Sequence, residues 1–343
     1  MSEDMKATGA QVIQLPTSSV GSPSHAPKEN AKPVHHKHYR SLGSSAKLWV
    51  IGSGKGGVGK SFITSGLGIT LSKLGYNVLL VDFDLAGANL HTVLGSKPSH
   101  LNIRHYFEAQ KKISDLVIPT EVPRLSYIQG FWDSWTPNQY TRDESQALLK
   151  DLKKLRYDVI LVDLGNGASE INLDFFQAAD DKILVSTPEP TSVERTYRFI
   201  EAYICFCLQQ TLQKDVYQDL VSTLRQYRQR SLSGNFSFPK YLRDKGLNPE
   251  TFEVLSRNPV RLLVNQSRSQ QNNDLGFSIK SVARKYYDLG IDFVGAVEYD
   301  NAVWQSVRSR EHVLFAQPFT TLAGQLMSVS KHLIDPQELA AVG

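Results

Sequence analysis

The sequence reads Gly54-Lys55-Gly56-Gly57-Val58-Gly59-Lys60-Ser61 at the point that decides its fold. The apolar run at residues 47–51 before it predicts a buried strand, and residues 62–74 after it predict a helix. A glycine-rich turn between a strand and a helix exposes backbone N–H groups at the positive end of the helix. This stretch therefore predicts a loop that binds phosphate groups.

The side chains of this loop indicate which phosphate ligand to expect. Lys60 is expected to reach the β- and γ-phosphates of a nucleotide, and the Ser61 hydroxyl is expected to ligate Mg²⁺. Lys55 is a second lysine that an ordinary phosphate-binding loop lacks. Because Lys55 lies on the outer side of the loop, away from the pocket for its own nucleotide, we expect its partner to be a negatively charged group from outside that pocket.

Two other interpretations of the glycines remain open. The run Gly52-Ser53-Gly54-Lys55-Gly56-Gly57 also has the G-x-G-x-x-G spacing of dinucleotide-binding folds, and Asp82 ends the next strand as such a fold requires. The Lys60-Ser61 pair favours a triphosphate, because a pyrophosphate held by backbone needs no lysine there. A glycine-rich turn without a ligand is the remaining alternative.

Composition and charge bound the class of protein. The chain has 343 residues, 41% of them hydrophobic, and a net charge of +4, and Lys and Arg exceed Asp and Glu between residues 191 and 285. Its two cysteines, Cys205 and Cys207, lie beside an apolar run and are expected to pack in or near the core. We find no secretory leader and no apolar run of membrane-spanning length, so a cytoplasmic protein is expected.

Strands and helices alternate along most of the chain. This alternation predicts an α/β fold with a doubly wound, mostly parallel sheet of the P-loop NTPase type and a helical insertion. We expect a disordered tail at residues 1–45, a P-loop ATPase domain at 46–335 with the helical insertion at 210–258, and a C-terminal tail at 336–343. The further strands are expected at residues 77–81, 157–162, 182–185, 261–264 and 291–297.

Three aspartates follow the predicted strands. Asp82 and Asp84 come after the strand at 77–81, and Asp163 closes the strand at 157–162. Ligands of parallel sheets bind at the carboxyl ends of the strands, so these acids are expected near the loop. Asp163 is expected to hold Mg²⁺, Asp82 to support the metal from a second shell, and Asp84 to orient the attacking water.

These segments resemble the MinD/ParA family of deviant Walker-A ATPases, and within it the branch that contains FlhG and FleN. The matching segments are residues 54–61, 82–90 and 163–167, and the resemblance covers about residues 47–334. It implies an ATP-dependent homodimer in which Lys55 crosses to the partner's phosphates. It also implies that Asp84 is the hydrolytic acid and that Asn265 recognises adenine.

The expected site follows from the motifs and the resemblance together. The catalytic residues are Lys55, Lys60 and Asp84, and the expected metal-binding residues are Ser61, Asp82 and Asp163. The expected nucleotide-binding residues are Gly54, Gly56, Gly57, Val58, Gly59, Lys60, Ser61, Phe62 and Asn265. The expected cofactors are ATP and Mg²⁺.

The chain departs from the family in two places. MinD-type proteins end in a basic amphipathic helix, whereas the helix predicted at 322–334 has Lys331 as its only firmly basic residue, with His332 beside it. We therefore do not expect a C-terminal helix that inserts into a membrane. The Asp-Gln motif of the flagellar regulators is absent from residues 1–45.

The leading functional hypothesis is a nucleotide-switched dimeric ATPase that positions or counts a cellular structure, related to flagella, division or partition, together with an unknown protein partner. The alternative is ATP-dependent, non-specific DNA binding of the partition type. A scaffold that binds nucleotide without turnover is disfavoured, because Lys60, Ser61, Asp84 and Asp163 are all present. The DNA alternative uses Arg225, Arg228, Arg230, Lys240, Arg243 and Lys245.

Overall fold

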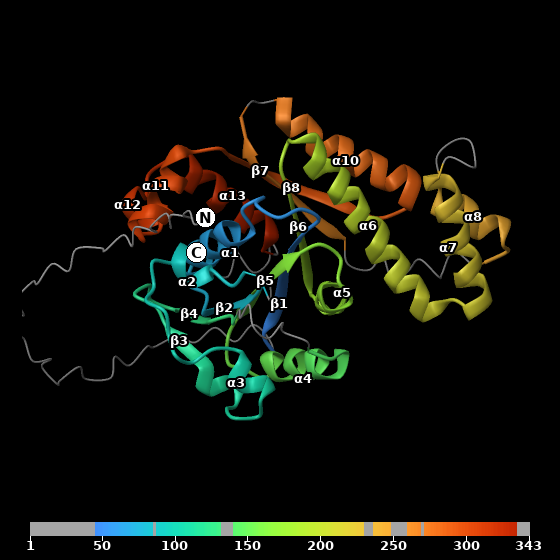
Figure 1. The fold of residues 1–343 in the computed structure, drawn as a ribbon. Coiled ribbons are helices and arrows are strands. Elements are labelled where there is room, and N and C mark those ends of the chain that lie inside the picture. The colour runs from blue at the N-terminus through green and yellow to red at the C-terminus, as the bar shows by residue number, and fades with distance from the viewer. Residues whose placement is uncertain are drawn as a thin grey trace, which may run out of the picture. The chain divides into compact units, whose positions relative to one another are not determined.

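A single eight-stranded sheet organises the protein. The structure, a computed structural model, describes residues 45–84, 87–131, 140–229, 236–247, 259–268 and 271–334. The strand order is β3-β4-β2-β5-β1-β6-β7-β8, and all neighbours are parallel except β3 and β4 (Figure 1). The strands are β1 (Lys47–Ser53), β2 (Val78–Phe83), β3 (Val117–Pro119), β4 (Leu125–Ile128), β5 (Val159–Asn166), β6 (Asp181–Ser186), β7 (Val260–Ser267) and β8 (Ile291–Glu298).

Helices cover both faces of the sheet, as the alternation predicted. The described helical segments are α1 (Lys60–Lys73), α2 (Leu90–Val93), α3 (Arg104–Phe107), η1 (Ile113–Leu116), α4 (Arg142–Lys153), α5 (Glu170–Ala178), α6 (Pro190–Thr211), α7 (Lys214–Arg228), α8 (Phe238–Asp244), α10 (Gln271–Tyr287), α11 (Asn301–Ser309), α12 (Val313–Ala316) and α13 (Thr321–Leu333). The doubly wound α/β fold is confirmed.

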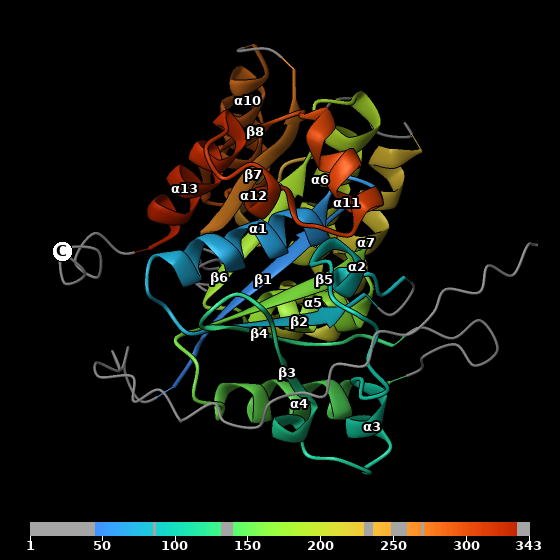
Figure 2. The same cartoon turned by 90° about the vertical axis from the view of Figure 1, so that its left-hand side faces the viewer.

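The two faces of the sheet carry separate hydrophobic clusters. Successive side chains of a strand point to opposite faces, so Val50 and Trp49 of β1 belong to different clusters. On one face the strands pack against α4, α5, α6 and α10, and on the other against α1 and α13. Helices α1 and α13 lie side by side on that second face (Figure 2). The central strand β1 is thus buried on both faces. This burial fixes the position at which the glycine-rich loop begins.

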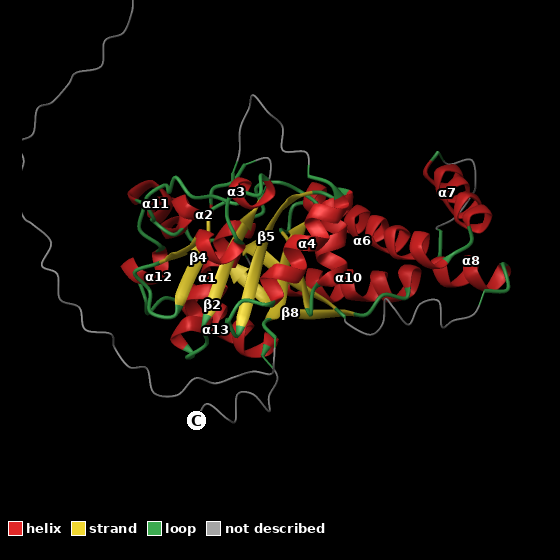
Figure 3. Cartoon of the chain, turned by 90° about the horizontal axis from the view of Figure 1, so that it is seen from below, coloured by secondary structure: helices red, strands yellow, loops and turns green. Residues whose placement is uncertain are grey.

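Helices α7 and α8 lie at the far end of α6, beyond the sheet (Figure 3). Both fall within the stretch expected to be an insertion, residues 210–258, of which residues 230–235 and 248–258 lie outside the described part. The Tyr241 hydroxyl donates to Asp219 Oδ2 at 2.6 Å, which ties α8 to α7. The tails expected at 1–45 and 336–343 lie almost entirely outside the described residues.

The observed elements differ from the predicted ones mainly at their ends. Asp163 was expected to close its strand, but β5 continues to Asn166, which pairs with Ser53 of β1 across a register shift. Helix α1 begins at Lys60 rather than at residue 62, because Gly59 forms its N-cap. The short strands β3 and β4 were not predicted. Within the described ranges, no helix has the length and apolarity needed to cross a membrane.

Candidate active site

The glycine-rich loop joins the central strand β1 to helix α1. Gly57 and Gly59 have φ angles of +77° and +87°, a region that favours glycine. A Cβ atom on Gly54 would meet the carbonyl oxygen of Arg195 in α6 at 2.1 Å. The loop therefore lies against the backbone of α6 and turns sharply into the positive end of α1, where anions bind.

Lys60 is the first residue of α1, and only 7% of its surface is exposed. Its Nζ donates a hydrogen bond to Ser53 Oγ at 3.1 Å. Burial lowers the pKa of Lys60, while the negative charges of Asp163 and Asp84 oppose that shift. The ammonium group is thus held beneath the loop, next to two acids.

Asp82 and Asp163 face each other on neighbouring strands, as the register of β2 and β5 requires. The Leu90 N–H donates to Asp82 Oδ2 at 2.9 Å, and the Asp84 N–H donates to Asp82 Oδ1 at 3.3 Å. Burial and the charge of Asp163 raise the pKa of Asp82 to about 8. Asp82 therefore anchors the backbone at both ends of the segment from residue 84 to residue 90.

Asp163 is the carboxylate best suited to a metal ion. It is 1% exposed, and its Oδ1 accepts a hydrogen bond from Thr64 Oγ1 at 3.3 Å. Its Oδ2 is buried and accepts no hydrogen bond from the described residues. Burial raises the pKa of Asp163 to about 6, although Ser61 and Lys60 favour the charged form. An unpaired buried oxygen next to the Ser61 hydroxyl fits Mg²⁺.

The rest of the Mg²⁺ coordination would come from other groups. The described residues contain no cluster of three or more His, Cys, Asp or Glu side chains arranged to hold a metal. Mg²⁺ commonly binds through one or two protein oxygens together with substrate phosphates and water. The donor set of Ser61 and Asp163 matches that pattern.

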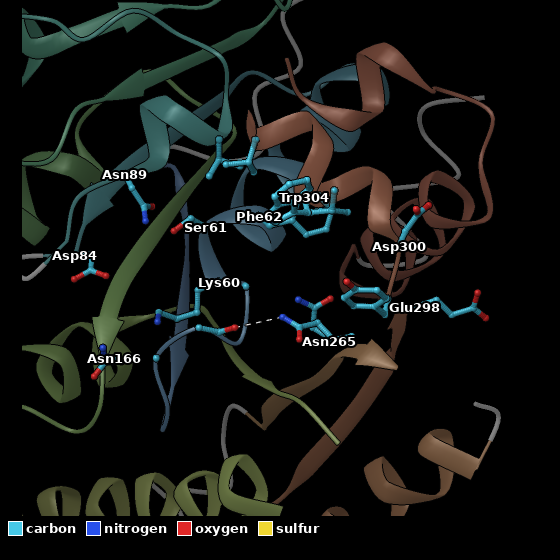
Figure 4. Close-up of a pocket in the computed structure, with 18 residues that line it drawn as sticks. Lys60, Ser61, Phe62, Asp84, Asn89, Asn166, Asn265, Glu298, Asp300 and Trp304 are labelled. Carbon is cyan, nitrogen blue, oxygen red and sulfur yellow. Dashed lines mark hydrogen bonds between the residues drawn. The ribbon is translucent and has the colours of Figure 1, made fainter. Parts of the chain in front are cut away.

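A pocket of about 430 Å³ opens beside the loop (Figure 4). The predicted site residues that line it are Gly56, Gly57, Gly59, Lys60, Ser61, Phe62, Asp84 and Asn265. The predicted residues Gly54, Lys55, Val58, Asp82 and Asp163 do not line it. Eight of the predicted site residues thus surround one pocket, and the buried Asp82 and Asp163 lie behind them.

Sequence reasoning missed more than half of the lining. These residues come from α2 and the residue before it, from the ends of β5, β7 and β8, and from α11 and the two residues before it. They are Asn89, Val93, Asn166, Gln266, Glu298, Tyr299, Asp300, Val303, Trp304 and Val307. The carboxyl end of β8 was an available signal, because it lies at the same edge of the sheet as the loop.

Asn265, at the end of β7, supports the loop from below. Its Nδ2 donates to the Val58 carbonyl oxygen at 2.8 Å, and Gln266 Nε2 donates to the Gly57 carbonyl oxygen at 3.3 Å. A Cβ atom on Gly59 would meet Asn265 Nδ2 at 2.4 Å, so the contact requires glycine. Asn265 therefore binds the loop and also lines the pocket. Its recognition of adenine stays a prediction.

Asp84 and Lys55 lie on different sides of the loop. A Cβ atom on Gly165 would lie 3.1 Å from Asp84 Oδ1, so the end of β5 approaches Asp84 closely. Lys55 Nζ forms an ion pair with Glu189 and donates to Thr191 Oγ1 at 3.1 Å, at the N-terminus of α6. Lys55 is thus directed away from the pocket of its own chain.

The loop, the buried lysine and the paired strand acids define the chain as a P-loop NTPase. The family described as ParA, NUBPL iron-transfer P-loop NTPase, matches residues 45–206. The chain is 33% identical over 168 residues to the flagellum site-determining protein YlxH of Helicobacter pylori, a match that covers 46% of this chain and 53% of that protein. It is 25% identical over 289 residues to the antiactivator FleN of Pseudomonas aeruginosa, covering 81% and 84%.

A solved structure shares this fold. The septum site-determining protein MinD of Pyrococcus horikoshii, complexed with Mg-ADP, superposes with a TM-score of 0.60 at 18% identity and covers 87% of this chain and 99% of that one. The chain is thus similar to P-loop NTPases of the ParA/MinD kind, among them the flagellar proteins YlxH and FleN. It spans about half the length of YlxH.

Proposed function

We propose that this chain binds Mg-ATP, hydrolyses it slowly, and forms a homodimer in its ATP state. The observation that carries this proposal is the pocket in which Lys60, Ser61 and Asp84 converge in front of the buried Asp163. Lys55 stands outside that pocket, where a second copy of the chain can meet it.

Binding uses the loop and the residues behind it. The backbone of residues 56–61 and the α1 N-terminus accept the phosphates, and the Lys60 ammonium offsets their charge. Ser61 and Asp163 would hold Mg²⁺, which neutralises charge on the β- and γ-phosphate oxygens when it is bound. Because Lys60 is already fixed by Ser53 at 3.1 Å, little reorganisation is needed when the nucleotide enters.

Hydrolysis requires a water molecule aimed at the γ-phosphorus. Asp84 lines the phosphate side of the pocket together with Asn166, and a carboxylate there accepts a hydrogen bond from the water and orients it. Gly165 leaves room for Asp84 at this position. Asp82 fixes the backbone of Asp84 through the hydrogen bond of 3.3 Å, so it positions the acid without contacting substrate.

The cellular role that we propose is to position or count a structure such as the flagellum. Support comes from the printed names of relatives, which include a flagellum site-determining protein and an antiactivator. In this proposal the ATP dimer presents a surface for a protein partner, and hydrolysis returns the chain to the monomer.

DNA binding is the second candidate function. Arg228 forms an ion pair with Glu201 at 2.8 Å, and Lys245 forms one with Asp219 at 2.8 Å. Arg230 lies outside the described residues. Two of the six cations that the alternative invokes therefore have carboxylate partners, but exposed pairs of this kind are weak and do not exclude DNA. We keep DNA as the second candidate because the relatives are named for flagellar and septum sites.

Replacing Asp84 by alanine tests the proposed hydrolysis. We expect Mg-ATP to bind with near wild-type affinity, whereas phosphate release falls by about 100-fold or more, because a positioned acid or base contributes about 10²–10⁴-fold. Phosphate release in single-turnover experiments measures this. Asp143→Ala, which removes an exposed carboxylate of α4 outside the pocket, is the matched control. Wild-type turnover in Asp84→Ala would remove Asp84 from the mechanism.

A further inference from the structure

One wall of the pocket carries a large exposed aromatic side chain. Trp304, on α11, is 61% exposed, whereas Trp49 in β1 is 2% exposed. Burying an aromatic side chain gains about 1.5–3 kcal/mol, so leaving this one in solvent forgoes that gain. An exposed tryptophan that lines a ligand pocket points to a contact made only when the ligand is present.

One half of the pocket is polar, and the other half carries most of its apolar side chains, beside Glu298 and Asp300 (Figure 4). The polar half contains Lys60, Ser61 and Asp84, which suit phosphates and Mg²⁺. In Figure 4, Trp304 and Phe62 lie together on the side away from Asp84. The apolar half is completed by Val93 of α2 and by Val303 and Val307 of α11. An adenosine triphosphate has the same two-part chemistry, with charged phosphates and a flat base.

A cation lies over one face of the indole ring. The Arg308 guanidinium lies over the Trp304 ring, 5.7 Å from its centroid. A cation over one face orients the ring and leaves the other face for a second planar group. Tyr299 is the other exposed aromatic side chain of the pocket, and Arg268 lies closer to its ring, at 4.6 Å. Both rings thus have a cation nearby, but Trp304 is the more exposed, at 61% against 47%, and lies beside Phe62 (Figure 4), so it is better placed to receive a base.

We infer that Trp304 stacks on the nucleobase and supplies much of the affinity for the nucleoside part of the ligand. This inference rests on the proposed nucleotide binding and adds a base-contacting residue to it. Alanine substitution of a side chain that stacks on a base costs about 1–3 kcal/mol, and 1.4 kcal/mol is a factor of ten. Removing the indole should thus weaken nucleotide binding about 10-fold, within a range of about 5- to 150-fold.

The test compares a ligand that has a base with one that lacks it. Calorimetry is performed on the full chain with Mg-ADP and with inorganic tripolyphosphate. We expect Trp304→Ala to bind Mg-ADP about 10-fold more weakly and tripolyphosphate as the wild type does. Trp304→Phe, which keeps a π face, should retain most of the Mg-ADP affinity, and Trp304→Leu should lose it. Phe319→Ala, which removes a 99% exposed aromatic side chain outside the pocket, is the matched control.

The possible outcomes separate this inference from the proposed function. Wild-type protein that binds neither ligand would refute nucleotide binding itself. Wild-type protein that binds both, with Trp304→Ala or Trp304→Leu unchanged toward Mg-ADP, would overturn only the stacking role. Quenching of tryptophan emission by Mg-ADP in the wild type, and its loss in Trp304→Phe, would support the role independently of affinity.

Discussion

His312 is a buried histidine that packs behind Phe62, a residue that lines the pocket beside the loop. Its ring stacks on Phe62 with centroids 5.7 Å apart. The Leu314 N–H donates to His312 Nδ1 at 3.2 Å, so the ring proton is on Nε2, which lies 3.0 Å from Ser65 Oγ. Burial and the positive charge of Lys73 lower the pKa of His312 to about 4. Phe62, the residue that follows Ser61, thus packs against a histidine ring that burial keeps uncharged at neutral pH.

This geometry predicts a pH-dependent contribution to stability. A histidine whose pKa falls on folding stabilises the native state fully above its unfolded pKa of about 6.5, and the contribution is lost as the pH falls toward 4. At pH 7 we expect His312→Asn to be less stable than the wild type. This difference should shrink by up to about 3 kcal/mol between pH 7 and pH 4, since 1.36 kcal/mol corresponds to one pKa unit.

Urea unfolding at several pH values measures the difference. Asparagine retains a cap acceptor for the Leu314 N–H but does not titrate. A gap between the two proteins that stays constant from pH 7 to pH 4 would contradict the prediction, because it would mean that folding leaves the pKa of His312 unchanged.

Single residues of the site were predictable where their signal is local in the sequence. Lys60 and Ser61 lie in one contiguous motif, so their place at the start of a helix follows from the glycines before them. Asn265 was expected only through the family resemblance, because a single asparagine carries no motif. Trp304 and Tyr299 were not predicted, since they reach the pocket from more than 200 residues away. The Lys55–Glu189 pair spans 134 residues and has no local signature either.

At the scale of elements, the loop and α6 are packed backbone to backbone. A Cβ atom at Gly54 would lie 2.1 Å from Arg195 O and 2.4 Å from Arg195 C, and neither atom can move without moving the helix. We predict that Gly54→Ala lowers the free energy of unfolding by about 2–3 kcal/mol, because overpacking a tight contact costs about 1–3 kcal/mol. The affinity for Mg-ATP should also fall, because the added Cβ atom would push the glycine-rich loop away from α6.

Gly324 provides the matched control for this prediction. It is an exposed glycine inside α13, and a Cβ atom there meets nothing within 4 Å. Gly324→Ala should therefore raise the free energy of unfolding by about 0.5–1 kcal/mol and leave Mg-ATP binding unchanged. Denaturant unfolding of both variants, with nucleotide binding measured in parallel, checks the pair. Wild-type stability and affinity in Gly54→Ala would contradict the close packing.

Long buried elements were predictable and short edge elements were not. The central strands β1, β2 and β5 are continuous apolar runs, and each was expected within a few residues of its bounds. Strands β3 and β4 have three and four residues at the sheet edge, too short for a periodic signal. Asp163 was expected at a strand end, but cross-strand pairing with β1 extends β5 past it, and the sequence of β5 alone does not encode that pairing.

At the scale of the whole molecule, we propose that Lys55 links the site to a second copy of the chain. Its ion pair with Glu189 is exposed to solvent: 35% of the Lys55 side chain and 60% of the Glu189 side chain are accessible. Exposed ion pairs contribute about 0–1 kcal/mol, so this pair holds Lys55 only weakly. The phosphates of a partner's nucleotide, with their larger negative charge, should compete for Lys55 successfully. The same lysine is thus expected to stay on its own α6 in the ADP state and to cross in the ATP state.

The solution mass of the protein, measured by light scattering with Mg-ADP and with a non-hydrolysable ATP analogue, tests this nucleotide switch. We predict the mass of one chain with Mg-ADP and of two chains with the analogue. Lys55→Ala should bind the analogue but keep the mass of one chain. A wild-type mass that is the same with both nucleotides, or a Lys55→Ala variant that dimerises as the wild type does, would contradict the switch.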